Sequence, residues 1–208
     1  MLNIKKLLLL VIPVFLISIT SCGEGGGSEG GEAGTTNPGA TQVSKQGFHM
    51  PGRDCLACHN YDLQNVRHLT IGGTVFKSQN IKDINNVNNL CGGNLKIVLM
   101  DASNPSNTID SNNYKDPNSK GYKGKGNVFI LSRKLPNIQG SYYVQITDEN
   151  GKVIAVSTLP HNFTSGYYDI TNPADTLNRY SCNACHSVNP KGGAPGVIYP
   201  NANANLCK

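Results

Sequence analysis

Short runs of apolar and β-branched residues, separated by polar and glycine-rich segments, fill the middle of the chain. Five of these runs have the length and composition of β-strands, and they cover residues 69–76, 95–100, 127–131, 142–147 and 152–158. In the fourth run Tyr142, Val144 and Ile146 alternate with more polar neighbours, as in a strand with one buried face. Asn150-Gly151 then predicts a hairpin turn. Because no segment has a helical period of useful length, the pattern predicts an all-β fold, an antiparallel β-sandwich.

The first residues have a different pattern. Lys5 and Lys6 precede an apolar run at residues 7–19, which is the layout of a bacterial secretory signal. The run is shorter than the roughly 20 residues that a membrane-spanning helix needs. It also contains Pro13, so a cleaved signal over residues 1–21 is the better prediction. The segment Ile19-Thr20-Ser21-Cys22 resembles the lipobox of bacterial lipoproteins, which implies that Cys22 becomes an acylated N-terminus.

Residues 22–45 are rich in Gly, Ser, Glu and Thr and contain few large apolar side chains, so they are predicted to form a flexible tether. Residues 46–208 are then long enough for one domain. Residues 1–21 contain two lysines and no acidic residue, so removing them lowers the formal net charge from +5 to +3. This mildly basic balance is not that of a nucleic-acid-binding protein.

The sequence Cys-X-X-Cys-His occurs at residues 55–59 and again at 182–186. Two thiols at this spacing can bond to both vinyl groups of a haem, and the adjacent imidazole can bind its iron. The predicted attachment residues are Cys55, Cys58, Cys182 and Cys185, and the predicted proximal ligands are His59 and His186. A zinc site split over the two cysteine pairs, or two dithiol redox motifs, would not explain a histidine after each pair. The motifs therefore predict two haem c groups.

Three histidines remain as candidates for the second ligand of each iron. A haem that only carries electrons usually has such a ligand, whereas an open position lets small molecules bind. His49 lies six residues before Cys55, and Pro51-Gly52 predicts a turn that could fold it back toward a haem. His161 follows Pro160 and is predicted to lie on a loop. His49 and His161 are the predicted distal ligands, and His68, which opens a strand, is the alternate.

Cysteine parity predicts one disulfide. The chain has seven cysteines. If Cys22 is acylated and four others bind haem, Cys91 and Cys207 remain, and disulfides persist in exported proteins. A bridge between Cys91 and Cys207 is therefore expected.

The order of segments 73–76, 96–101, 126–130 and 142–146, followed by Asn150-Gly151-Lys152, resembles the carboxypeptidase-regulatory-like family of transthyretin-type β-sandwiches. With the two Cys-X-X-Cys-His motifs as flanks, residues 49–190 resemble exported bacterial cytochrome lipoproteins that carry such a domain between two haem sites. The resemblance implies a sandwich core over about residues 69–160, flanked by two loop-borne c-type haem sites. The chain departs from it in the stretch 102–125 and in the Asn-rich tail after Pro200.

Together these features predict an electron carrier rather than an enzyme, with other redox proteins such as cytochromes as partners. The sandwich is expected to fix the separation of the two haems. The lipid anchor predicts attachment to the outer membrane or cell surface, and assembly into a homo-polymer, an extracellular filament, is left open. The alternative function is a small haem enzyme, of the peroxidase or nitrogen-oxide reductase type, with one open iron position. Lysines in the stretch 102–134 could dock an acidic partner or simply keep a loop soluble.

Overall fold

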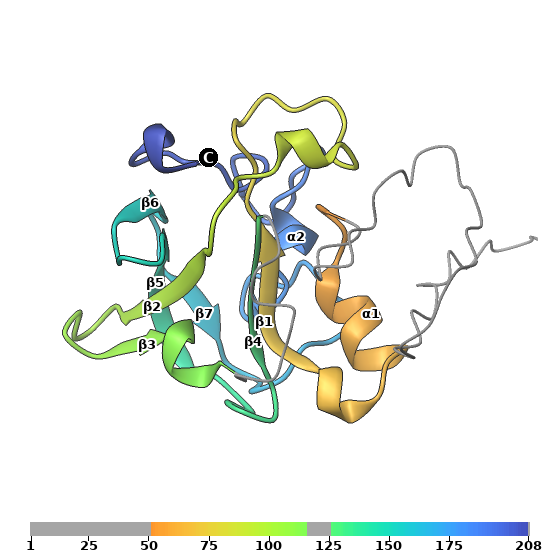
Figure 1. Ribbon diagram of the computed structural model, residues 1–208. Helices are drawn as coiled ribbons and strands as arrows, with labels where there is room; N and C mark the ends of the chain where they lie inside the picture. Colours follow the sequence, from red (N-terminus) through yellow and green to blue (C-terminus); the bar gives the residue numbers. More distant parts are fainter. Residues whose placement is uncertain (1–50, 116–125, 208) are drawn as a thin grey trace, which may run out of the picture.

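The structure, a computed structural model, describes residues 51–115 and 126–207. The predicted signal peptide and tether, together with Cys22 and His49, lie outside these residues. In the described part of the chain most regular structure is β-strand in antiparallel sheets, and the helices are short (Figure 1). No helix within residues 51–115 and 126–207 is long and apolar enough to cross a membrane.

Seven strands are formed: β1 (Leu69–Thr74), β2 (Lys96–Asp101), β3 (Thr108–Asp110), β4 (Asn127–Leu131), β5 (Gly140–Thr147), β6 (Val153–Val156) and β7 (His161–Phe163). Five of them, β1, β2, β4, β5 and β6, lie where the hydrophobic pattern predicts strands. The other two have three residues each, which is too short for a period of two to be recognised. β3 lies in the stretch 102–125, and β7 contains His161, so the prediction that His161 lies on a loop is wrong.

The strands form two antiparallel sheets. β1 and β4 form a two-stranded sheet, and the second sheet has the order β3-β2-β5-β6 with β7 also paired to β5. β6 lies against residues 145–147 of β5, and β7 lies against residues 140–142. One edge of β5 is thus shared by two short strands, and the chain between them turns away from the sheet at Ser157–Pro160.

A single large apolar core joins the two sheets. Side chains from both sheets and from the helices are buried in it, among them Leu56, Ile71, Ile97, Ile130 and Ile154. Each large aliphatic or aromatic side chain buried in this way contributes about 1.5 to 3 kcal/mol of hydrophobic stabilisation. β1 is buried along its whole length, because β4 and the core lie beside it and the segments that carry the Cys-X-X-Cys-His motifs cover it.

Both motifs lie on helices, so the prediction of two loop-borne sites is wrong. The first motif forms most of α1 (Cys55–Tyr61), and the second forms α2 (Cys182–Cys185) with His186 directly after it. With lengths of seven and four residues, these helices have too few turns to produce a recognisable helical period. Four 3-10 turns, η1 (Asn65–Arg67), η2 (Val87–Asn89), η3 (Ser111–Tyr114) and η5 (Ala204–Leu206), complete the regular structure described.

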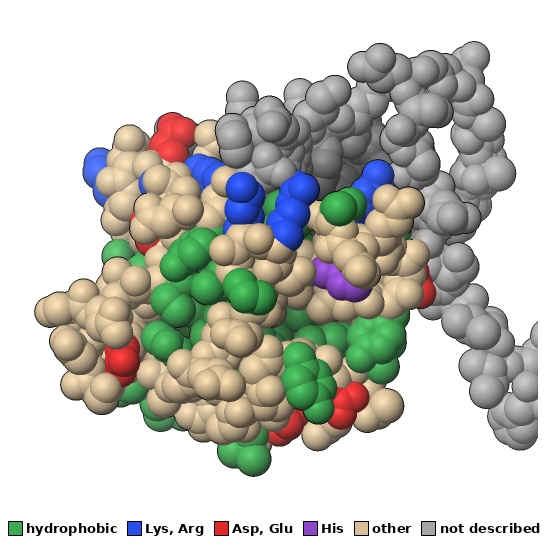
Figure 2. Space-filling view, turned by 90° about the horizontal axis from the view of Figure 1, so that it is seen from below, with side chains coloured by type: hydrophobic (Ala, Val, Ile, Leu, Met, Phe, Trp, Pro, Cys, Tyr) green, Lys and Arg blue, Asp and Glu red, His purple; other side chains and the backbone are tan. Residues whose placement is uncertain are grey.

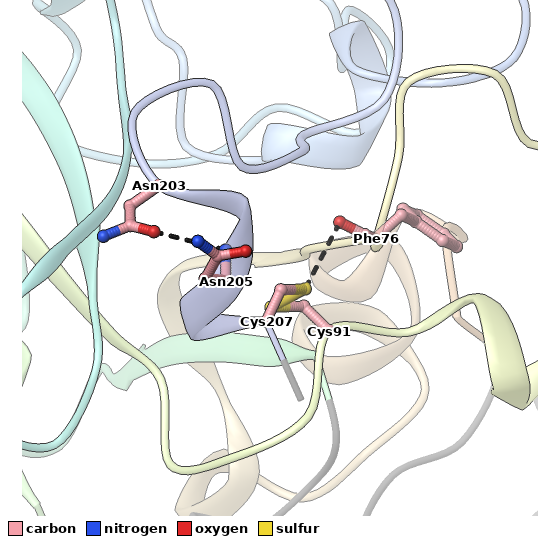
Figure 3. Close-up of a disulfide and its surroundings, with 5 residues drawn as sticks. All are labelled: Phe76, Cys91, Asn203, Asn205 and Cys207. Carbon is pink, nitrogen blue, oxygen red and sulfur yellow. Dashed lines mark hydrogen bonds between the residues drawn. A yellow bond between two sulfur atoms is a disulfide. The ribbon is translucent and has the colours of Figure 1, made fainter.

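A β-bridge, side-chain hydrogen bonds and a disulfide hold the C-terminal tail against the rest of the domain. Ile198 forms a bridge with Val75, and the Asn201 side chain accepts a hydrogen bond from the Val156 N–H and donates one to the Val156 carbonyl, each at 2.8 Å. Cys207 forms a disulfide with Cys91, with 4.8 Å between their Cα atoms (Figure 3). The predicted disulfide is therefore confirmed, and it joins the tail to the loop that follows η2.

Candidate functional site

Both motif helices pack against β1, where the strand contains two adjacent glycines (Figure 1). A Cβ atom at Gly73 would lie only 2.5 Å from the Cβ of Cys182, and one at Gly72 would lie 3.4 Å from the Leu56 side chain and 3.6 Å from the Cβ of Cys55. The two glycines thus allow the first cysteine of each motif to approach the same short stretch of backbone. Although they are far apart in the sequence, the motifs belong to one site.

The Cys55 and Cys182 thiols are in an environment that disfavours the thiolate. Burial raises the pKa of Cys55 to about 12, and the charge of Asp54 contributes to the shift. Burial likewise raises the pKa of Cys182 to about 12, with Cys55 and Cys185 adding to it. Cys185 is also shifted upward, mainly by burial. These three cysteines are free thiols in the structure, whereas Cys58, the fourth predicted attachment residue, is disulfide-bonded.

The histidine after each motif has a fixed ring orientation. Nδ1 of His59 is 2.7 Å from the Arg67 carbonyl oxygen, and Nδ1 of His186 is 2.9 Å from that of Gly196. Because a carbonyl only accepts, Nδ1 must donate in both cases, which places the lone pair of each ring on Nε2. A histidine that binds a metal commonly donates its other ring N–H to such an acceptor. Both rings therefore have the tautomer expected of a ligand that binds through Nε2.

A cavity of about 310 Å³ lies beside the second motif. Its size falls in the range of about 300 to 1,000 Å³ usual for small-molecule sites. Its walls include apolar side chains of both sheets and of the tail, such as Val144, Ile146 and Val197. Cys182, Cys185, His161 and His186 also line it. Among the described residues on these walls, Arg179 is the single Lys, Arg, Asp or Glu.

His161, at the start of β7, faces His186 across this site. The two ring centres are 6.2 Å apart and the ring planes differ by 16°. Two imidazoles bound through Nε2 to opposite sides of one metal ion, with metal–nitrogen bonds of about 2 Å, have ring centres roughly 6 Å apart. The centre-to-centre distance of this stacked pair thus matches that of two ligands of one metal ion.

His161 is partly buried, and one of its ring nitrogens, Nδ1, is buried without a hydrogen-bond partner among the described residues. Burial lowers the pKa of His161 to about 4, and the positive charge of Arg179 acts in the same direction. Burial lowers the pKa of His186 as well. Both rings are therefore neutral at pH 7, which is the form that binds metals.

His68 has a different environment from the other histidines. Its Nε2 is 3.1 Å from the Leu63 carbonyl oxygen and must donate to it, so the lone pair of this ring is on Nδ1. Of the three candidate distal ligands, the structure brings His161 to a motif histidine and gives His68 a backbone partner at Nε2. The third, His49, lies outside the described residues. No group of three or more His, Cys, Asp and Glu side chains arranged to hold a bare metal ion occurs among residues 51–115 and 126–207.

The site also contains residues that are not part of the Cys-X-X-Cys-His pattern. Asp54 caps the N-terminus of α1, accepting hydrogen bonds from the backbone N–H groups of Leu56 and Ala57. An aspartate directly before a helix is a recognised cap signal, and a Gly-Gly pair inside a strand marks a close approach of another segment. Asn183, in α2, carries no comparable local signal, because its side-chain partners Arg53 and Thr74 come from distant parts of the chain.

Apolar side chains are exposed near the first motif. Tyr61, at the end of α1, is 53% exposed, and Val66 in η1 is 52% exposed. Figure 2 shows hydrophobic side chains gathered on the face seen from below, with a histidine on the same face and Lys and Arg side chains along one side of it.

Comparisons of the chain with protein-family models, with curated proteins and with solved structures found no match.

Proposed function

We propose that this protein is an exported, lipid-anchored dihaem c-type cytochrome that carries electrons at the bacterial cell surface or in the periplasm. One observation carries the proposal: the second Cys-X-X-Cys-His motif lines an apolar cavity, and its histidine stands 6.2 Å from a second neutral imidazole, that of His161. A haem bound there would supply one-electron chemistry at its iron, with no other catalytic group required.

In this proposal each residue of the second site has a defined role. Cys182 and Cys185 form the thioether bonds, His186 is the proximal ligand and His161 the distal ligand. The apolar walls exclude water and lower the local dielectric. Arg179 uses two of its donors on the carbonyls of Thr176 and Gly192, so other donors of its guanidinium group are left to pair with a haem carboxylate.

The first site is proposed on the same chemistry. Cys55 and Cys58 on α1 attach the haem, which requires Cys58 as a thiol in place of the disulfide it has in this structure. His59, oriented by the Arg67 carbonyl, is the proximal ligand. His49 is proposed as its distal ligand. The two sheets and their common core are consistent with a carboxypeptidase-regulatory-like sandwich, which we propose as the finer description of the fold.

The cysteine environments favour haem attachment over dithiol redox chemistry. Reactive cysteines of Cys-X-X-Cys oxidoreductases have lowered pKa values. Here the pKa values of Cys55 and Cys182 are raised to about 12. A protein that exchanges disulfides through these motifs would need the opposite shift.

The test is to produce the full chain in a bacterial host that matures c-type cytochromes and to analyse its proteolytic peptides by mass spectrometry. The peptides that contain residues 55–59 and 182–186 should each carry one covalent haem, and the protein should give the absorption spectrum of a low-spin cytochrome. Unmodified cysteines in both peptides, or zinc in place of iron, would refute the proposal.

A further inference from the structure

The N-termini of the two motif helices are joined by side-chain hydrogen bonds. Oδ1 of Asp54 accepts from the N–H groups of Leu56 and Ala57 at 3.1 and 3.2 Å, and the same oxygen accepts from the Ser181 hydroxyl at 2.6 Å. Ser181 is the residue before α2, but its side chain makes no hydrogen bond to its own helix. The aspartate that begins α1 thus also holds the residue that begins α2.

A second connection runs through Asn183, which is 4% exposed. Its Nδ2 donates to the Arg53 carbonyl at 2.7 Å and to the Thr74 hydroxyl at 3.1 Å, while its Oδ1 accepts from the Thr74 N–H at 3.0 Å. The side chain therefore connects α2 to the residue before Asp54 and to the end of β1. Satisfied networks of buried polar groups of this kind restrict the groups to one relative geometry.

Both oxygens of the Asp54 carboxylate accept hydrogen bonds in this network. Its second oxygen accepts from the Tyr168 hydroxyl at 2.6 Å, so the group accepts four hydrogen bonds from three different segments of the chain. Hydrogen bonds to a carboxylate are stronger than those between neutral groups. Tyr168 and Ser181 are 7% and 2% exposed, so water competes little for these bonds.

We propose that Asp54 is a positioning residue for electron transfer between the two haems. Cys55 directly follows Asp54 and Cys182 directly follows Ser181, so the bond between Asp54 and Ser181 holds the first attachment point of one haem beside that of the other. The clamp, defined as Asp54, Ser181 and Asn183, thereby sets one separation and orientation for the haem pair. This inference rests on the proposed function, because it requires a haem at each motif.

The charge of Asp54 has a second effect that can be separated from its role in the clamp. A negative charge beside a haem stabilises the oxidised, more positive iron, so it lowers the reduction potential. Since Asp54 lies next to both motifs, it should lower both potentials. An Asp54→Asn substitution keeps an oxygen able to accept from Ser181 but removes the charge.

The experiment compares holoprotein of Ser181→Ala with wild type. The loss of this hydroxyl removes the bond between Asp54 and the residue before α2, and it leaves both the cap of α1 and the Asn183 connection in place. Ser103→Ala is the matched control, because Ser103 donates to Asp101 at the same distance of 2.6 Å in an exposed turn. The readouts are covalent haem content, the exciton couplet in Soret circular dichroism, and the spin–spin interaction of the two ferric irons.

Wild type and Ser103→Ala should show the same couplet and spin interaction, and Ser181→Ala should lose most of both while keeping two haems. Asp54→Asn should retain the couplet with both reduction potentials raised. A couplet unchanged in Ser181→Ala, or absent from wild type that carries two haems, would overturn the clamp alone. If Ser181→Ala does not fold, Asn183→Ala decides, because it removes the other connection of the clamp, and a couplet unchanged in that variant counts against the proposal. Wild type without haem would instead overturn the proposed function.

Discussion

The histidines differ in which ring nitrogen is committed to a backbone carbonyl, and this difference separates the proposed ligands from the others. His59 and His186 donate from Nδ1, whereas His68 donates from Nε2. The ring of His68 would have to break its bond to Leu63 before it could bind a metal through that atom. The sequence alone could not make this distinction, because the partner carbonyls are defined by the turns around η1 and by the loop before the tail.

A His161→Ala variant is expected to open one iron coordination position. The remaining ligand, His186, cannot complete six-coordination alone, so one haem should become high-spin and bind carbon monoxide in its reduced state. The measurement is the absorption spectrum before and after carbon monoxide, and His68→Ala is the control, in which no haem should change. A high-spin haem in His68→Ala together with an unchanged spectrum in His161→Ala would show that the assignment is reversed.

Gly73 is a residue at which a single methyl group should be poorly tolerated. The added Cβ would lie 2.5 Å from that of Cys182, which cannot move without displacing α2 from β1. Such overpacking costs about 1 to 3 kcal/mol, so Gly73→Ala should lower the urea midpoint and reduce haem attachment at residues 182–186. In Gly72→Ala the closest atom, 3.2 Å away, is a terminal methyl group of Leu69, so that variant should be affected less. Equal losses in the two variants would argue against the proposed contact.

At the scale of elements, alternation of side chains was enough to predict five strands but not the elements that complete the site. In β2 burial alternates, with Ile97 and Leu99 buried. In β5 the predicted inward residue Ile146 is buried, but so is its neighbour Thr147. α1 and α2 are stabilised instead by capping and by packing on β1. Short helices gain little from propensity alone, so the pattern predicts loops at both motifs. It also predicts a loop at His161, because β7 is too short to show a period.

The disulfide between Cys91 and Cys207 should stabilise the folded domain through the tail. It closes a loop with a sequence separation of 116 residues, and native disulfides of small exported domains contribute about 2 to 5 kcal/mol. A Cys207→Ser variant should therefore unfold at a lower urea concentration than wild type. Wild type measured in reductant is the matched control, because thioether bonds resist reduction whereas the bridge between Cys91 and Cys207 should open. A midpoint equal to that of oxidised wild type would contradict the prediction.

At the scale of the whole molecule, the site is assembled from segments that the sequence separates. Asp54 and Ser181 are 127 residues apart and hydrogen-bonded to each other. The sequence predicts that the sandwich fixes the separation of the two haems, and the structure brings both motifs directly to β1. A residue that acts between distant segments, such as Asn183, gives no periodic or spacing signal, so only the folded chain reveals it.

The central claim is that two c-type haems are each bound by a pair of histidines. The most direct measurement is the low-temperature electron paramagnetic resonance spectrum of the fully oxidised holoprotein, with covalent haem counted on the same sample. The account predicts two low-spin ferric haems per chain, no high-spin signal, and no near-infrared band from a methionine ligand. A high-spin signal equal to one iron per chain, or a methionine band, would contradict it.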